Sequence, residues 1–487
     1  MNWFATAGQK RFIRNYGDAL RSRDGALFVG AGVSRAAGFV DWKALLRDLA
    51  ADLDLDVDRE TDLVALAQFH LNSRGTRAGI NQALIDGLTD GAVPTKLHDV
   101  LARLPVDTVW TTYYDQLLEQ AFAAAGKAVD VKLTIQNLAQ LRRGKDVTLY
   151  KMHGCVTQPQ DAVLTKDDYE RYADKRALFS DSLKGDLIEK TLLFLGFSFT
   201  DPNIEQILSR VRGHLGTNQR DHYCVMRRRP RSPDLAGAAL AEFEYEARKA
   251  EYQVADLKRF GIQTVSIEEY EHLTPLLQAV AAYTNRDSVF VSGAAADAAP
   301  LGPDRLHAIA RRIGQRLITD NFRLVSGFGT GIGEQVALGA LRALFGRPDP
   351  RDPDRVVIRP FPAPSSSEHQ AATYTRHRED LLSRAGAVVV IAGNKASNMG
   401  GIQPASGVVE EVRIAQAMGK IIIPIGVTGH VAADVWTQAM NNPELFLPGL
   451  DVQQVLSVLG DETASDDSLI DAVFEILDAG RQRAAAP

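Results

Sequence analysis

Short apolar runs recur through the first 285 residues, and stretches with the apolar spacing of amphipathic helices separate them. Short runs bounded by glycine or polar residues are typical of buried strands. Strands that alternate with helices predict a parallel sheet with helices on both faces. The strands expected here are Ala26–Val29, Thr108–Thr111, Thr148–Lys151, Thr191–Leu195, His222–Met226 and Gly261–Ile267, and the helices are Gln9–Leu20, Leu235–Val254 and Leu273–Thr284.

A second series of the same kind begins at Ser288. Its expected strands are Ser288–Ser292, Phe322–Ser326, Val356–Arg359, Ala387–Ile391 and Ile421–Ile425, with a helix from about Arg305 to Thr319. Because this half has its own strands, helices and glycine turns, we expect it to fold independently. The sequence therefore predicts an α/β protein of two Rossmann-like, doubly wound parallel-sheet domains, residues 1–285 and 286–487. The runs 347–354 and 363–370 are expected to be surface loops.

The composition narrows the class of protein. A chain of 487 residues is too long for one hydrophobic core. Its 45% hydrophobic and 24% charged residues are typical of a globular protein, and a net charge of −6 gives no general attraction to nucleic acid or anionic lipid. We expect no transmembrane segment and no secretory signal. The basic run 227–231 is expected to be a solvated loop. With only Cys155 and Cys224, a reducing compartment and no four-cysteine zinc site are expected, so the protein is predicted to be cytoplasmic and metal-free.

Each half contains one glycine-rich segment directly after an apolar strand. The first is Gly30-Ala31-Gly32 with Ser34, and the second runs from Gly327 to Gly333. A helix is expected after each segment, and bare backbone N–H groups at such a turn commonly bind phosphate. The first segment does not have the spacing of the dinucleotide fingerprint. Two such loops on different domains predict an enzyme with its own nucleotide sensor.

Three further motifs lie at the carboxyl ends of expected strands in the first half. They are the run 110–115, which ends in Asp115, the run 151–154, which contains His153, and the run 196–203. Because ligands collect at the carboxyl ends of parallel strands, we expect these motifs to form one site with the first glycine loop. Their order along residues 10–285 resembles the sirtuin family, and specifically its bacterial defence-associated, NAD-cleaving branch.

The sirtuin resemblance implies a role for each residue. It implies that the glycine loop holds the diphosphate of NAD, that Asp115 meets the nicotinamide ribose and that His153 is the catalytic base. A histidine with an ordinary pKa near 6.5 can accept a proton at neutral pH. The residues implied to bind NAD are Gly30, Ala31, Gly32, Ser34, Asp115, Gly196, Ser198 and Asn203, and the catalytic positions are His153, Tyr113 and Asp115.

Two departures from the sirtuin pattern bear on the activity. Deacylating sirtuins carry a four-cysteine zinc module after the His-Gly motif, whereas residues 156–172 contain no cysteine. We therefore expect cleavage of NAD with water as the acceptor. The asparagine of the family falls on Tyr113, where a longer and rigid phenol is expected to project into the ribose site. Tyr113, whether natural or introduced, is thus expected to weaken or abolish the activity of this chain.

Four stretches of the second half suggest a nucleotide pocket: the end of its first strand, the glycine segment, the run 374–378, and the runs 393–395 and 406–411. Arg378 and Lys395 supply positive charge for a diphosphate, and Glu410 can accept from a ribose hydroxyl. Residues 286–487 resemble the SLOG domain, a Rossmann-like nucleotide sensor. The catalytic loop of its hydrolase relatives is degraded, so binding is expected rather than hydrolysis. The candidate effector residues are Ser292, Gly293, Gly327, Gly329, Thr330, Gly331, Gly333, Arg378, Lys395 and Glu410, with Arg376 a weak candidate.

A sirtuin-like domain followed by a SLOG domain resembles the effector family of the Thoeris anti-phage system. That resemblance implies an NAD+ hydrolase activated by a cyclic ADP-ribose isomer, which a partner TIR-domain enzyme makes on infection. It also implies a homo-oligomer, expected to be a tetramer, with neither nucleic acid nor membrane as a partner. Two alternatives remain open. In the first alternative, the chain is a non-catalytic nucleotide sensor or scaffold, and Tyr113 favours this interpretation. In the second, it is an NAD-dependent protein deacylase, which the missing cysteines disfavour.

Overall fold

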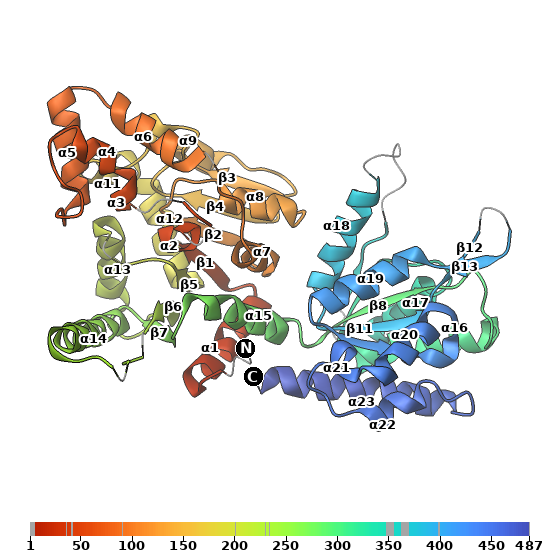
Figure 1. Cartoon of the computed structure of the whole chain (residues 1–487). Helices are drawn as coiled ribbons and strands as arrows, with labels where there is room; N and C mark the ends of the chain where they lie inside the picture. The colour runs from red at the N-terminus through yellow and green to blue at the C-terminus, as the bar shows by residue number, and fades with distance from the viewer. Residues whose placement is uncertain are drawn as a thin grey trace. The chain divides into compact units, whose positions relative to one another are not determined.

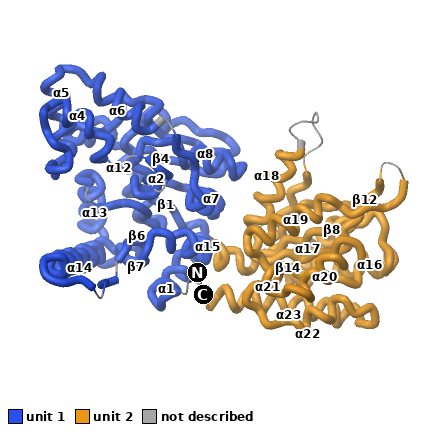
Figure 2. Tube along the Cα trace, in the orientation of Figure 1, with its two compact units in different colours: residues 1–280 blue, residues 281–487 orange. Residues whose placement is uncertain are grey.

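The chain consists of two compact units, residues 1–280 and 281–487 (Figure 2). The computed structural model describes residues 5–35, 37–39, 42–89, 91–199, 201–228, 230–232, 234–346, 355–361, 370–397 and 400–486. Helix α15 (Leu273–Thr284) closes the first unit and continues for a few residues into the second. None of the helices in these ranges combines the length and the apolar character that crossing a membrane requires.

The first unit is built on a parallel sheet of seven strands in the order β3-β4-β2-β1-β5-β6-β7 (Figure 1). The strands are β1 (Gly25–Val29), β2 (Thr108–Thr111), β3 (Val129–Lys132), β4 (Val147–Lys151), β5 (Thr191–Leu195), β6 (His222–Arg227) and β7 (Ile262–Ile267). Every residue of β1 is buried, as expected for a strand in the middle of a sheet covered on both faces.

Helices connect these strands. They are α1 (Ala7–Arg21), α2 (Ala31–Arg35), α3 (Trp42–Leu45), α4 (Arg47–Ala51), α5 (Leu63–Arg74), α6 (Ala78–Thr89), α7 (Lys96–Arg103), α8 (Leu117–Ala124), α9 (Ile135–Ala139), α10 (Lys166–Glu170), α11 (Tyr172–Lys175), α12 (Ala177–Glu189), α13 (Pro202–Leu215) and α14 (Gly237–Lys258). Helix α1 begins at Thr6, which forms a reciprocal capping box with Gln9. Its buried face includes Tyr16, whose hydroxyl donates to the carbonyl of Ala26 in β1.

Strand β3 was not predicted from the sequence. Its side chains Asp130 and Lys132 are polar, and a polar pair within four residues gives no strand signal. In the structure both are buried and form an ion pair of 2.9 Å, with the Lys132 ammonium also donating to the carbonyl of Asn137. The ion pair therefore allows two charged side chains to be buried in a strand, which the hydrophobic pattern alone does not reveal. The basic run was also placed imperfectly, since Arg227 ends β6 rather than lying in a loop.

The second unit contains a parallel five-stranded sheet in the order β10-β9-β8-β11-β14 and a separate antiparallel pair, β12-β13. The strands are β8 (Ser288–Ala294), β9 (Arg323–Ser326), β10 (Val356–Ile358), β11 (Ala387–Ala392), β12 (Asn394–Ala396), β13 (Ile402–Pro404) and β14 (Ile421–Pro424). The two parallel sheets confirm the predicted fold class. The predicted loop 347–354 lies outside the described residues, as does 363–370 except Gln370, with which helix α18 begins.

The helices of the second unit are α16 (Pro303–Thr319), α17 (Gly333–Phe345), α18 (Gln370–Ser383), α19 (Ser406–Ala417), α20 (His430–Asn441), α21 (Pro443–Phe446), α22 (Gln453–Val458) and α23 (Asp466–Ala485). Helices α16 and α17 approach so closely that a Cβ on Gly339 would lie 1.8 Å from the carbonyl oxygen of Arg311. Arginines of α16 pair with aspartates at the start of α23, for example Arg305 with Asp466 at 2.7 Å. These contacts hold the last helix against the sheet unit.

Candidate active site and nucleotide site

The four motifs predicted in the first unit follow strands that are neighbours in the sheet. In the order β4-β2-β1-β5, these strands precede His153, Asp115, the glycine loop and Gly196 respectively. Because the strands are parallel, their carboxyl ends share one edge of the sheet (Figure 1). The topology therefore brings together segments that lie more than a hundred residues apart in the chain.

The glycine loop packs directly against the segment after β5. The amide of Gly30 donates to the carbonyl of Leu195 at 2.8 Å, and that of Gly32 donates to the carbonyl of Gly196 at 2.9 Å. A Cβ on Gly30 would lie 2.5 Å from the oxygen of Gly196, which itself has φ +61°. The expectation that both glycine amides are bare is therefore wrong. These glycines allow two backbones to touch, and the phosphate role of the loop stays a prediction, resting on Ala31 and Ser34.

His153 is buried in an aromatic and charged environment. Its ring lies edge-on to Tyr169 and Tyr172, with centroids 5.5 and 5.9 Å away. Its Nε2 lies 3.3 Å from Oδ2 of Asp201 without making a hydrogen bond. Burial lowers the pKa of His153, the charge of Asp201 opposes this shift, and that of Arg176 adds to it. The imidazole is therefore neutral at pH 7 and able to accept a proton.

Asp201, which the sequence analysis did not select, caps helix α13. Its Oδ1 accepts from the amides of Asn203 and Ile204 at 3.0 and 3.1 Å. An aspartate directly before a proline at the first helical position was the signal that could have identified it as a cap. No local pattern shows that its second oxygen faces His153.

Three polar atoms in the predicted residues of the first unit are buried and accept or donate no hydrogen bond among the described residues. They are Oδ2 of Asp115, Nε2 of His153 and Nδ2 of Asn203. The other oxygen of Asp115 accepts from the amide of Leu117 at 2.8 Å. Buried polar groups almost always have a partner, so these atoms can form hydrogen bonds with a group outside the described residues. Nδ1 of His70 and Nε2 of His98 in the same unit lack a partner among the described residues as well.

Lys151 is a buried residue that the sequence analysis did not select. Its ammonium donates to the carbonyl of Asp115, to the carboxylate of Glu119 at 2.8 Å and to the sulfur of Cys155 at 3.2 Å. Burial acts to lower its pKa, but Glu119 and the other negative groups outweigh this effect and raise it. Lys151 is therefore a permanent cation that joins the segment of Asp115 to the segment after His153.

Tyr113 lies in a packed apolar cluster. It is 4% exposed and packs among residues of α3–α6, such as Leu49 and Leu84, and beside Tyr114, with ring centroids 5.9 Å apart. Its amide donates to the hydroxyl of Thr111 at 3.0 Å. A substitution by asparagine would remove a buried ring from this cluster, and the expected effect of Tyr113 on the activity stays a prediction.

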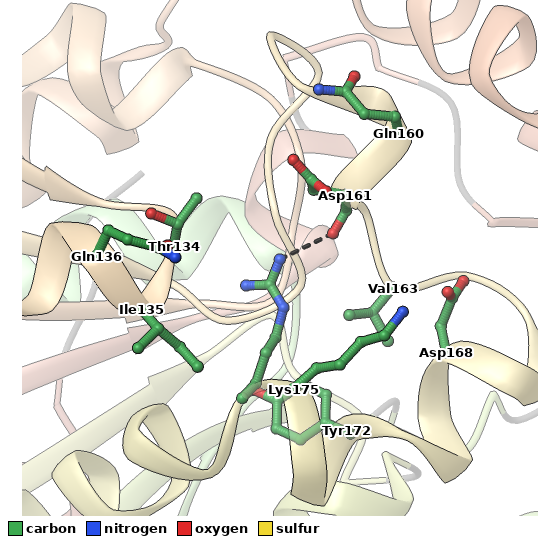
Figure 3. Close-up of a pocket in the computed structure, with 10 residues that line it drawn as sticks. Thr134, Ile135, Gln136, Gln160, Asp161, Val163, Asp168, Tyr172 and Lys175 are labelled. Atoms are coloured by element: carbon green, nitrogen blue, oxygen red, sulfur yellow. Dashed lines mark hydrogen bonds between the residues drawn. The ribbon is translucent and has the colours of Figure 1, made fainter.

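A pocket of about 270 Å³ borders the His153 region (Figure 3). Tyr172 and Val163 contribute to both, since the amide of Val163 donates to the carbonyl of His153. The guanidinium of Arg176, also at the pocket, donates to the carbonyls of Leu133, Met152 and Asp161. The remaining lining residues are Thr134, Ile135, Gln136, Gln160, Asp161, Asp168 and Lys175. This pocket cannot be predicted from local sequence patterns, because its walls come from separate short helices and turns.

In the second unit the glycine segment packs against the end of β8. A Cβ on Gly329 would lie 2.1 Å from the oxygen of Gly293, and one on Gly331 would lie 2.5 Å from that of Ala295. The carbonyl of Thr330 accepts from the amide of Ala295 at 2.9 Å. The predicted residues of β8 and of the glycine segment are therefore in contact, and tight backbone packing accounts for the glycines.

Arg378 and Glu410, both predicted to bind the effector, are paired with each other. Arg378 lies in helix α18 rather than at a strand end, and its Nη1 donates to Oε2 of Glu410 at 2.7 Å. The hydroxyl of Thr375 also donates to Glu410. A Cβ on Gly407 would lie only 2.8 Å from Nη2 of Arg378, so a glycine at that position leaves room for the guanidinium.

Glu411, the neighbour of Glu410, is the more deeply buried of the two and was not selected from the sequence. Its Oε2 accepts from the hydroxyl of Ser292 at 2.5 Å, and its Oε1 lies 3.7 Å from Nε of Arg378, which makes no hydrogen bond to a described residue. Burial raises the pKa of Glu411 to about 7. An arginine with 11% of its side chain exposed, two carboxylates and a serine hydroxyl thus converge beside the end of β8.

The remaining predicted effector residues are more exposed. Lys395 in β12 donates to the hydroxyl of Ser406 at 2.9 Å, at the start of α19. Arg376 is exposed on helix α18, away from the buried side that holds Arg378.

Two family models match the chain. The SIR2-like domain matches residues 107–251, and the Sir2- and TIR-associating SLOG family matches residues 272–480. The chain is 38% identical to the NAD(+) hydrolase ThsA of Bacillus cereus (strain MSX-D12) over 470 residues, 96% of this chain and 97% of that protein. Proteins of the same name from Cytobacillus dafuensis and Acinetobacter baumannii (strain 532279) are each 36% identical over 96% of this chain, and 96% and 98% of their own length is covered. The SIR2-like match contains Asp115, His153 and Gly196 but not the glycine loop.

Proposed function

Because the chain belongs to the ThsA family of NAD+ hydrolases, the effectors of Thoeris anti-phage defence, we propose that its first unit cleaves NAD+ into nicotinamide and ADP-ribose. The reaction is placed at the carboxyl edge of the seven-stranded sheet. The observation that supports this placement is the pair of buried polar atoms without partners among the described residues, Oδ2 of Asp115 and Nδ2 of Asn203, at the sheet edge that also holds His153. A hydroxylated, polar substrate would complete their hydrogen bonds.

The chemistry needs one proton acceptor and an ordered ribose. The bond between the nicotinamide nitrogen and the ribose C1 breaks, and the nitrogen keeps the electron pair, so a cationic ring leaves as neutral nicotinamide. Water adds its oxygen to the same carbon and gives up a proton to neutral His153, whose pKa is lowered by burial. Asp115 would orient the ribose through its unpaired oxygen. No step in this scheme requires a metal ion.

Release of nicotinamide tests the placement. Purified chain is incubated with NAD+, and nicotinamide and ADP-ribose are measured in parallel, because hydrolysis requires equal amounts of both. An Asp115→Asn variant should release less of both products. Products formed at the unchanged rate by this variant would contradict the assigned site.

We further propose that the second unit binds a cyclic ADP-ribose isomer made by a partner TIR-domain enzyme. The support is the convergence of Arg378, Glu410 and Glu411 beside the glycine segment. The diphosphate would compete with Glu410 for the guanidinium of Arg378, and Glu410 would then accept from a ribose hydroxyl. Binding would thus exchange an internal ion pair for a ligand contact.

The coupling between the units is proposed to be a change in subunit packing. A homo-oligomer, expected to be a tetramer and to assemble through the sirtuin-like units, would supply the two states that the ligand shifts. The cytoplasm is proposed as the compartment, since Cys155 and Cys224 are free thiols. Measurement of oligomer mass with and without ligand by analytical ultracentrifugation tests this part, and a monomer under all conditions would contradict it.

A further inference from the structure

We propose that Asp201 is a positioning residue for His153 in the NAD+ hydrolysis proposed above, on which this inference rests. Its carboxylate holds one nitrogen of the imidazole and leaves the other nitrogen to take the proton of the attacking water. Sequence motifs select His153 but give no partner for it, and the structure supplies one.

The two oxygens of Asp201 face different groups. Oδ1 accepts from the amides of Asn203 and Ile204 at the first turn of α13, and Oδ2 lies 3.3 Å from Nε2 of His153. The helix start fixes the carboxylate, because two backbone amides hold one of its oxygens in place. The second oxygen is therefore aimed at the ring by secondary structure rather than by a flexible side chain alone.

The groups around His153 come from several elements. Tyr169 of α10 and Tyr172 of α11 lie edge-on to the ring, and Arg176, which precedes α12, acts on its charge. The hydroxyl of Tyr169 also bonds to Asp201. Asp201 is the carboxylate in this surrounding and Arg176 is the cation. Burial, with Arg176 acting in the same direction, lowers the pKa of His153 and keeps the imidazole neutral, although Asp201 places a negative charge beside it.

This arrangement suits a base that must hold a proton briefly. When His153 takes the proton of water it becomes an imidazolium, and the neighbouring carboxylate of Asp201 stabilises that charge. The distance of 3.3 Å without a hydrogen bond is expected in a ligand-free site, where such contacts tighten when the substrate binds.

The test compares Asp201→Asn with Asp62→Asn in the full chain. Asparagine caps a helix as well as aspartate does, so both variants lose one carboxylate and keep a cap. Asp62 caps α5 and pairs with exposed Lys166, so it serves as the matched control. Hydrolysis of NAD+ is measured with cyclic ADP-ribose isomers, in the wild type or in Tyr113→Asn, whichever is more active. We expect kcat/KM to fall by about tenfold or more in Asp201→Asn, as for other residues that orient a reacting group, and to stay unchanged in Asp62→Asn.

The pH profile separates positioning from a structural effect. Removal of the Asp201 charge lowers the pKa of His153 further, so the acidic limb of kcat/KM should move to lower pH while the plateau falls. The same shift is measured without substrate by NMR of ring-labelled histidines, with His153→Ala for assignment. An unchanged pKa of His153, together with kcat/KM within twofold of the control, would overturn the proposal. Absence of nicotinamide release from the parent protein would instead overturn the proposed function, and the NMR shift would still decide on Asp201.

A second variant covers the case in which Asp201→Asn fails to fold. Tyr169→Phe keeps the ring against His153 and removes the hydroxyl that bonds to Asp201. We expect a loss of about fivefold in kcat/KM. The variant loses a hydrogen bond to the carboxylate of Asp201, which contacts His153, while His153 itself is unchanged. Activity equal to that of the parent in this variant would count against Asp201.

Discussion

The two units have similar glycine loops but differ in how far the polar side chains of their predicted sites are already hydrogen-bonded. In the first unit, three buried polar atoms on Asp115, His153 and Asn203 lack hydrogen-bond partners among the described residues. In the second, Arg378 is paired with Glu410 at 2.7 Å, and Glu411 is bonded to Ser292 at 2.5 Å. The first arrangement is open for a polar substrate. In the second, Nε of Arg378 also lacks a hydrogen-bond partner among the described residues, but the carboxylates of Glu410 and Glu411 are already bonded, so a ligand must replace those contacts.

This difference matches the two proposed roles. A catalytic site benefits from groups that the substrate completes, because unsatisfied groups favour the bound and reacting state over the empty one. A sensor needs two states of similar stability that a ligand can exchange, and an internal ion pair supplies the ligand-free one. In both loops the glycines serve the close approach of backbones, as the contacts of Gly30 and Gly329 show. The glycine pattern alone therefore does not distinguish the two roles.

The largest effect is expected from the group that carries the proton. His153→Ala should lower NAD+ hydrolysis by at least about a hundredfold, which is the usual contribution of a general base. His214, exposed at the end of α13, gives the matched control variant His214→Ala, which should behave as the parent. The measurement is nicotinamide release at saturating activator. Retention of more than a tenth of the activity would show that the open site does not act through His153.

The next effect sharpens the role of the paired site. Arg378→Ala should weaken activation by a cyclic ADP-ribose isomer by about 10- to 100-fold in ligand concentration, since a charge-assisted contact to the diphosphate is lost. Arg376→Ala on the exposed face of the same helix is the control. Calorimetric binding and activated hydrolysis are measured together. A variant that binds and switches as the parent does would remove Arg378 from the effector site.

The smallest effect concerns Glu411 and the stability of the second unit. The pKa of this carboxyl is raised by burial from 4.5 to about 7. Between these values the folded state holds a proton that the unfolded state has lost, so the free energy of unfolding falls as pH rises, by up to about 3 kcal/mol. Glu411→Gln should remove this fall, which thermal unfolding at pH 5 and pH 8 detects. The control is Glu475→Gln, exposed on α23. An equal pH dependence in both variants would contradict a buried, protonated Glu411.

The strand pattern allowed most of both sheets to be predicted, because buried strands of parallel sheets are short and continuously apolar, as β1 and β11 are. Strand β3 escaped prediction because a buried ion pair, Asp130 with Lys132, resembles a loop in sequence. Helices α3–α6 were not predicted either. Their apolar side chains form one cluster with Tyr113, and nothing in the local sequence pattern shows that contact.

The motifs predicted that His153 and Asp115 lie at the edge formed by the carboxyl ends of the strands, because parallel strands end at the same edge of a sheet. They did not reveal Asp201, since a capping residue looks the same whether or not its second oxygen meets a histidine. Glu410 was selected and Glu411 was not, although two adjacent glutamates look alike in the sequence. Only their burial, which the sequence does not show, distinguishes them. What the sequence could not supply is in each case a contact between segments distant in the chain.

The most direct test of the account is nicotinamide release from NAD+ by the full chain and by Tyr113→Asn, each with and without cyclic ADP-ribose isomers. Removing the buried ring should cost stability, about 2–4 kcal/mol as for other large-to-small core changes, so unfolding is measured alongside. The account predicts ligand-dependent hydrolysis that is strongest in Tyr113→Asn. If the folded Tyr113→Asn chain binds a cyclic ADP-ribose isomer and still releases no nicotinamide, the sensor-gated hydrolase is contradicted and the chain is a nucleotide sensor without catalysis.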